Sequence, residues 1–276
     1  MTAVDWIGAE LTPEALHLWV AVAGRVPVRR AVPLSPGDAP EVALASARLQ
    51  LSNSAVRPVL CCGFPGAPTR PLPCPPLAAD RPIADVAGNL LLPDLVQPAP
   101  RLVLPAAHAL RLAGCLAADP GFDGVICLPG PLSYWVETSA GEVISATAAF
   151  SGALAEALTA SRWFAPQPPA ADAIDLAAFD ADLPQTMSRP ERMLRMLAEA
   201  RALPPPAVRA RLYAALIGAD LAAARPWWLG RRLRVLGENA ALYARALAAQ
   251  GVPVTVGDAE AALIAGFALA ARVVTK

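Results

Sequence analysis

The first half of the chain alternates short apolar runs with polar turns, a pattern that predicts strands followed by a helix. Apolar and β-branched residues at 4–8, 16–20 and 26–32 predict three strands that follow one another as a meander. Residues 40–52 have helical spacing, and the apolar run at 59–63 predicts a buried strand that ends at a glycine. This order is typical of a sheet covered by a helix.

A second succession of strands and helices begins near residue 100. It predicts strands at 102–104, 124–128, 134–138 and 142–146, and helices at 106–118, 151–162, 190–201 and 204–224. Two proline-rich stretches, 63–76 and 165–171, are predicted to be loops.

The repeated order of elements predicts an α/β protein with two related domains around a cleft. We expect one domain at 1–100 and a second at 101–257, with a final helix at about 258–276 packing back on the first.

The last fifth of the chain carries a strand, a glycine, a helix, a strand and a second glycine. The strands are predicted at 233–236 and 252–256, and each is followed directly by its glycine, Gly237 or Gly257. A glycine after a strand lets the backbone approach a flat ligand, and the next helix offers free N–H groups to anions. The segment therefore predicts a nucleotide site.

Composition narrows the class of protein. The 276 residues include 23 acidic and 23 basic side chains with no block of like charge, which argues against a nucleic-acid groove. No uncharged run approaches the roughly 20 residues of a membrane span, and the N-terminus lacks a basic leader, so we expect a cytoplasmic protein that does not enter membranes.

Five cysteines without a CxxC pair and two histidines give little material for a zinc site. Lys276 is the only lysine, so no internal lysine can clamp a phosphate.

Several short motifs in a fixed order together resemble a known family. They are Asp5-Trp6, Cys62–Gly66, Leu72–Pro75, Leu128–Val136, Leu216–Asp220 and Gly257–Ala259. The chain resembles the 2-dehydro-3-deoxygalactonokinases over nearly its whole length. These are sugar-acid kinases of the actin/hexokinase/Hsp70 superfamily.

The resemblance implies two ribonuclease-H-like domains that flank a cleft for ATP, Mg²⁺ and the sugar acid. It implies that Asp5 is catalytic and holds Mg²⁺ at the end of the first strand. The nucleotide-binding residues that it implies are Gly130, Ser133, Gly237, Glu238 and Gly257, and the implied substrate-binding residues are Trp6, Gly63 and Gly66.

The chain departs from the family at its polar positions. The family has small hydroxyl residues after its Asp-Trp pair, whereas this chain has Ile-Gly-Ala-Glu-Leu at residues 7–11. Glu10 adds a carboxylate, which repels phosphate unless a cation intervenes. The family's Thr-His-Ser-Lys-Trp turn is 131–135 here, where Pro131 removes an N–H donor and Tyr134 replaces the lysine. Glycines and apolar core residues remain.

Two functions follow, and the sequence leaves open whether the protein is an enzyme. One is ATP-dependent phosphorylation of 2-dehydro-3-deoxygalactonate at its 6-hydroxyl, with impaired activity. The other is a degenerate homologue that binds a nucleotide or a sugar acid without transferring phosphate.

Individual residues also have structural alternatives. Trp6 either packs or lines a ligand site, and Ser133 either donates to phosphate or serves a hairpin. Glu238 either touches ribose or favours a helix dipole. His108 is either a general base or, more often for such a residue, a structural one. Trp227-Trp228 either pack or mediate contact with a second copy in a homodimer.

Overall fold

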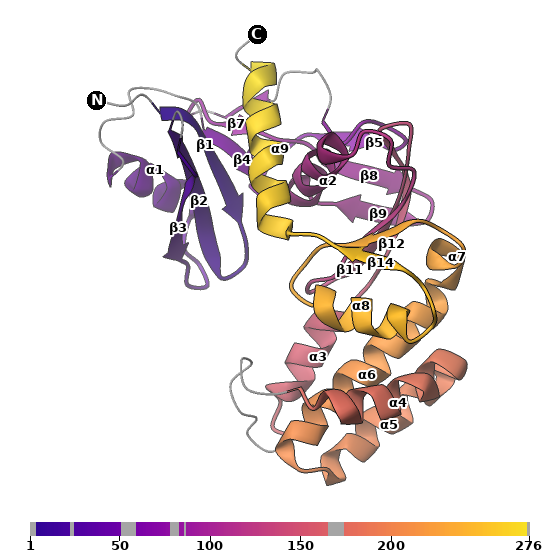
Figure 1. Ribbon diagram of the computed structural model, residues 1–276. Helices are drawn as coiled ribbons and strands as arrows, with labels where there is room; N and C mark the ends of the chain where they lie inside the picture. Colours follow the sequence, from indigo (N-terminus) through magenta and orange to yellow (C-terminus); the bar gives the residue numbers. More distant parts are fainter. Residues whose placement is uncertain are drawn as a thin grey trace. The chain divides into compact units, whose positions relative to one another are not determined.

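The structure is a computed structural model that describes residues 4–22, 25–50, 59–77, 83–85, 87–164 and 174–274 (Figure 1). The predicted loop at 165–171 and Lys276 lie outside these ranges. The chain divides into two compact units. Unit 1 comprises residues 1–122, 140–144 and 259–276, and unit 2 comprises residues 123–139 and 145–258.

Unit 1 is built on a mixed sheet with the order β3-β2-β1-β4-β7-β6. Its strands are β1 (Val4–Leu11), β2 (Ala15–Val22), β3 (Val28–Pro33), β4 (Val59–Cys62), β6 (Ile83–Ala84) and β7 (Leu90–Leu91). The first three strands are antiparallel neighbours, which confirms the predicted meander. β4 runs parallel to β1, and β7 runs parallel to β4.

The alternation of side chains along β1 places helices on both faces of this sheet. Ile7 and Ala9 point into a core with Leu44 of α1 (Pro40–Gln50). On the opposite face, Gly8 makes room for the Phe267 ring of α9 (Ala259–Val274), because a Cβ at Gly8 would lie 2.7 Å from that ring.

A smaller sheet in unit 1 has the order β5-β8-β9, from Thr69–Pro71, Asp94–Pro98 and Arg101–Leu104. β5 lies inside the stretch that we predicted to be loop, so that part of the prediction is wrong. Proline is tolerated there because β5 is an edge strand that pairs only with β8 in this sheet.

Unit 2 repeats the strand order of unit 1. Its sheet runs β12-β11-β10-β13-β14, formed by Glu142–Ala149, Ser133–Ser139, Gly124–Leu128, Leu233–Val235 and Val254–Val256. As in β3-β2-β1-β4-β7, the central strand pairs antiparallel on one side and parallel on the other. This duplication agrees with the two related α/β sheets that the repeated strand–helix order predicted and with the ribonuclease-H-like fold that the family resemblance implies.

The helices of unit 2 lie between its last three strands in the chain, and several of them share a hydrophobic core with the sheet (Figure 1). They are α3 (Ser151–Thr159), α4 (Leu176–Ser188), α5 (Met193–Glu199), α6 (Pro205–Ala223), α7 (Arg225–Trp228) and α8 (Ala240–Ala248), with 3₁₀ turns at Pro190–Arg192 and Ala200–Ala202. Within the described residues, no helix is both long and apolar enough to cross a bilayer.

Two glycines allow α2 (Ala106–Ala118) and α9 to pack with their backbones nearly touching (Figure 1). A Cβ at Gly114 would lie 2.0 Å from the carbonyl oxygen of Ala262, and one at Gly266 would lie 2.2 Å from that of Leu110. The final helix is thus fixed on unit 1 by a contact that only glycine permits.

We expect Gly114→Ala to lower the free energy of unfolding by about 1–3 kcal/mol, because the added methyl group overpacks the helix pair. This loss exceeds the gain of about 1 kcal/mol in helix propensity. Urea unfolding measures it, with Gly121→Ala as the control because nothing lies within 4 Å of a Cβ there. Equal stability of the two variants would contradict the close packing.

Candidate functional site

The carboxyl ends of three parallel strands meet at one edge of the unit 2 sheet. β10 ends at Leu128, β13 at Val235 and β14 at Val256. Three of the predicted nucleotide-binding residues, Gly130, Gly237 and Gly257, follow these strand ends. Ligands of open α/β sheets bind outside the carboxyl ends of strands. The structure therefore gathers these glycines where a ligand is expected.

The glycines at this edge differ in how closely other atoms pack against them. A Cβ at Gly237 would lie 1.9 Å from the carbonyl oxygen of Pro129, and one at Gly152 would lie 2.0 Å from that of Gly130. Both residues must therefore be glycine for the backbone to pack. At Gly130, by contrast, an added Cβ would meet only the carbonyl oxygen of Leu132, at 3.7 Å. Gly130 is thus the one of these three with room beside it.

The hydroxyl of Ser133 is engaged within the protein. It donates a hydrogen bond to Asp220 of α6, whose side chain is buried. The same carboxylate accepts from Ser151 at 3.2 Å, from the Trp135 indole at 3.2 Å and from the Tyr243 hydroxyl at 2.5 Å. Four donors from β11, α3 and α8 thus converge on one acid of α6.

Burial raises the pKa of Asp220, and its four donors oppose that rise. Burial, together with the neighbouring Asp220, raises the pKa of Tyr243 well above its usual range, so the phenol keeps its proton and donates it. We call these residues, Asp220 with Ser133, Trp135, Ser151 and Tyr243, the Asp220 network. It joins the first part of β11, directly after the turn that follows β10, to three helices of unit 2.

Glu10 lies at the corresponding edge of the unit 1 sheet. It is paired with Cys62 in the register of β1 and β4, and Gly63 follows directly. Gly63 has φ +80°, and a Cβ there would lie 2.6 Å from the carbonyl oxygen of Leu11. Gly66 also has positive φ, +77°, in an open part of the same loop. Gly63 therefore lies at the carboxyl edge, directly after the partner of Glu10, and Gly66 follows in the same loop.

Arg111 of α2 neutralises Glu10. Its Nη2 atom lies 2.9 Å from one oxygen of the carboxylate and 3.2 Å from the other. The side chains of Arg111 and Glu10 are only 17% and 12% exposed. The cation that a carboxylate at this position requires is therefore supplied by the protein.

Asp5 and Trp6 lie at the opposite end of β1. Asp5 is exposed, and five residues of strand, about 16 Å, separate it from Glu10. The structure thus does not bring Asp5 together with Gly63 or Glu10. The Trp6 ring stacks on Phe267 with 5.8 Å between ring centroids, which is the packing alternative for this residue.

The remaining candidates are divided between surface and core. Glu238 is exposed, and its charge acts on Tyr213 of α6. Trp228 is buried and donates to the carbonyl oxygen of Leu221 at 2.8 Å, while Trp227 packs against the same core. The tandem tryptophans therefore pack within unit 2.

His108 of α2 is a second titratable residue whose environment includes Arg111. Burial, together with the positive charge of Arg111, lowers the pKa of His108 to about 3. A histidine with this pKa is neutral but a very weak base at pH 7, which favours the structural role.

The depressed pKa of His108 predicts a loss of stability in acid. The unfolded chain takes up this proton below about pH 6.5, whereas the folded protein does so only near pH 3. The free energy of unfolding should therefore fall through this window by about 1 kcal/mol per pH unit, less than the full value of about 1.4 kcal/mol because the residue as a whole is only half-buried. Urea midpoints at pH 7 and 5 should differ less in His108→Gln than in the wild type. Identical shifts in both proteins would contradict the prediction.

Metal-ligating side chains are sparse. Across the described part of the chain, no group of three or more His, Cys, Asp or Glu residues could hold a metal ion. Magnesium in phosphate-transfer sites commonly takes one or two carboxylates and otherwise water and substrate phosphates. The described residues therefore offer a metal ion at most two neighbouring ligands of these kinds.

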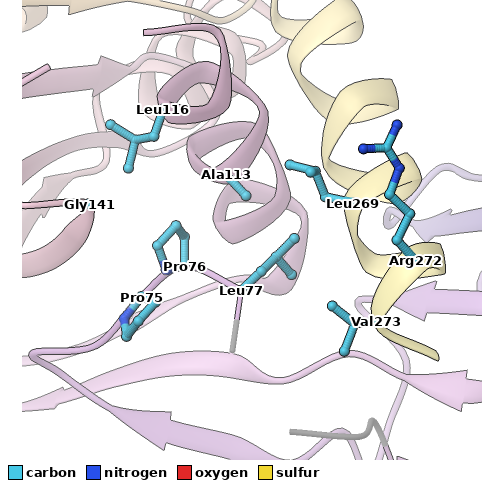
Figure 2. A pocket seen from close by; sticks show the side chains of 9 residues that line it. All are labelled: Pro75, Pro76, Leu77, Ala113, Leu116, Gly141, Leu269, Arg272 and Val273. Atoms are coloured by element: carbon cyan, nitrogen blue, oxygen red, sulfur yellow. The ribbon is translucent and has the colours of Figure 1, made fainter. Parts of the chain in front are cut away.

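One cavity of about 360 Å³ lies within unit 1 (Figure 2). Its lining is apolar apart from Arg272 and comes from α2, α9, Gly141 and the segment 75–77. None of the predicted site residues lines it, so we do not assign it to the candidate site.

Comparison of the sequence with models of known protein families identifies the family to which this chain belongs. The sequence matches the model of the 2-keto-3-deoxy-galactonokinase family over residues 23–270. The chain belongs to this family. Comparison with curated proteins found no match.

Two solved structures resemble the fold of this family member. A candidate 2-dehydro-3-deoxygalactonokinase from Sinorhizobium meliloti has a TM-score of 0.79 and 22% identity, covering 97% of this chain and 98% of that one. Component A of (R)-2-hydroxyglutaryl-CoA dehydratase from Acidaminococcus fermentans has a TM-score of 0.54 and 9% identity, covering 98% and 99%. The fold is that of the actin/hexokinase/Hsp70-like ATPases.

The family match begins at residue 23 and so leaves out the β1–β2 hairpin. Asp5, Trp6 and Glu10 all lie in that hairpin. The strand that carries the implied catalytic aspartate therefore lies outside the part of the chain that matches the 2-keto-3-deoxy-galactonokinase family.

Sequence reasoning missed Arg111 and the centre of the Asp220 network. Asp220 was noted only as part of a motif, although it is the single acid in the apolar stretch 212–224. An isolated acid among apolar helix residues is a usable signal of a buried, hydrogen-bonded carboxylate.

Proposed function

We propose that this protein binds ATP with Mg²⁺ and phosphorylates 2-dehydro-3-deoxygalactonate at its 6-hydroxyl, at a rate well below that of ordinary kinases. Family membership supports the reaction class. One structural observation supports the low rate: the turn after β10 has few donors for phosphate, because Pro131 lacks an N–H and the Ser133 hydroxyl donates to Asp220.

In this proposal, the unit 2 edge holds the nucleotide. Gly130 lies beside the phosphates, while Gly237, Glu238 and Gly257 frame the adenosine. Mg²⁺ supplies charge neutralisation for the transferred phosphoryl group when it is bound with ATP. Asp5 remains the acid that the family resemblance assigns to the metal.

At the unit 1 edge, the proposal places the sugar acid beside Gly63 and Gly66. Trp6, which the family resemblance also implies as substrate-binding, is not part of this placement, because it lies at the opposite end of β1 and its ring packs on Phe267. The cytoplasmic location that we propose fits the five cysteines, all of which are buried free thiols.

A degenerate homologue that binds ligands without phosphoryl transfer is the second candidate. The same donor-poor turn favours it. Overnight incubation of stoichiometric protein with ATP, Mg²⁺ and the sugar acid, followed by mass spectrometry, separates the two. A sugar-acid phosphate above the protein-free control supports the slow kinase, and no product supports the binding protein.

We expect ATP with Mg²⁺ and adenosine to bind with similar, weak affinity. Each missing charged hydrogen bond forgoes about 1.5–3 kcal/mol, so the loss of two weakens ATP binding by about a hundredfold or more. Calorimetric titration of both ligands measures this.

Pro131→Thr is the informative variant for this titration, because it restores an N–H and a hydroxyl at an exposed position of the turn. It should tighten binding of ATP but not of adenosine. A strong ATP preference in the wild type would contradict the assignment of the turn.

A further inference from the structure

The pair of Glu10 and Arg111 is the polar feature of unit 1 that the fold does not explain. Glu10 projects from the last part of β1, and Arg111 projects from the middle of α2. Both side chains are largely buried. Removing two charges from water costs several kcal/mol per ion, so such a pair is poor evidence of a device for stability.

Arg111 has hydrogen-bonding capacity left over. A guanidinium carries five N–H donors, and only Nη2 is engaged here, with both oxygens of Glu10. Within the described ranges, Glu10 is its only hydrogen-bond partner. The Nε and Nη1 donors therefore remain for an acceptor from outside the protein, which the residual 17% exposure of the side chain allows to approach.

The pair of Glu10 and Arg111 lies at the edge of the sheet where a ligand is expected. Glu10 and Cys62 end the parallel pair β1 and β4, and Gly63 turns the backbone with positive φ directly after them. The carboxyl edge of such strands is where α/β sheets bind ligands. A carboxylate that holds one side of a guanidinium also fixes the plane of its remaining donors, which suits recognition of a second carboxylate.

We propose that Arg111 binds the carboxylate of the sugar-acid substrate and that Glu10 positions it. This assignment rests on the proposed function, since it names the residue that recognises the acid group of that substrate. The competing anion is a phosphate of ATP, which has the same attraction to a guanidinium.

Calorimetry with 2-dehydro-3-deoxygalactonate, with its neutral amide and with ATP tests the assignment. The wild type should bind the acid more tightly than the amide. Arg111→Gln should weaken binding of the acid about tenfold to a hundredfold and leave binding of the amide and ATP unchanged. Arg231→Gln is the matched control, because Arg231 makes an ion pair of the same 2.9 Å length with Glu137 in unit 2.

A second variant is needed because Arg111→Gln leaves the Glu10 carboxylate without its cation, which could unfold the protein and so abolish binding indirectly. The double variant Glu10→Gln with Arg111→Gln removes both charges and should show the same loss of acid binding with a native circular dichroism spectrum. If either folded variant binds the acid as the wild type does, the assignment is overturned while the proposed function stands. If ATP affinity falls instead, the anion is a phosphate and the assignment is also overturned. A wild type that binds no sugar acid overturns the proposed function and the assignment together.

Discussion

Asp220→Ala should lower the free energy of unfolding by about 3–5 kcal/mol, the largest effect that we expect from one side chain. The substitution leaves the hydroxyls of Ser133, Ser151 and Tyr243 and the indole of Trp135 without their common acceptor, in a site that water reaches poorly. Each buried donor without an acceptor costs about 1–3 kcal/mol, and relaxation of the site recovers part of the sum.

Urea unfolding measures this loss, and Asp180→Ala is the matched control. Asp180 also accepts from a side chain of α8, Arg245, but the two side chains are 43% and 44% exposed. Exposed pairs contribute about 0–1 kcal/mol, so the control should be close to the wild type. Equal losses for the two variants would show that the Asp220 network does not stabilise unit 2.

Asp220→Asn separates shape from charge in the same site. The amide retains the volume of the acid but replaces one acceptor oxygen by a donor that faces other donors. Its stability should therefore fall between those of the wild type and Asp220→Ala.

The sequence predicted the parts of the fold that depend on local pattern. The apolar runs of β1, β4 and β10 and the glycines after β4 and β13 are visible within a few residues, so they predicted the repeated sheets and the edges where Gly63 and Gly237 lie. α4 was missed because Pro184 lies inside it and its apolar face is weak. β8 was missed because Asp94, Gln97 and Pro98 leave it only a short apolar stretch.

The candidate site was harder to predict because its contacts join distant residues. Glu10 and Arg111 are 101 residues apart, and Ser133 and Asp220 are 87 apart. No spacing rule connects such pairs. The same limit affects Ser133, since only the fold shows that its hydroxyl donates to Asp220.

We expect the turnover of the wild type to be below about 0.1 s⁻¹, against about 1–100 s⁻¹ for ordinary kinases. Phosphoryl transfer depends on positioning and on neutralising charge, and loss of one cationic contact costs about 10³–10⁵ in rate. The lysine that the family resemblance implies in the turn is Tyr134 here, and its side chain is buried. Pro131 and Ser133 supply no replacement for it.

Steady-state assay of ADP release with 2-dehydro-3-deoxygalactonate, ATP and Mg²⁺ tests this central claim most directly, with Asp5→Asn beside the wild type. The account predicts a wild-type turnover below about 0.1 s⁻¹. Turnover near 1 s⁻¹ or above, in the ordinary range for kinases, that is abolished by Asp5→Asn would contradict it, because it would show that the substituted turn still performs the chemistry.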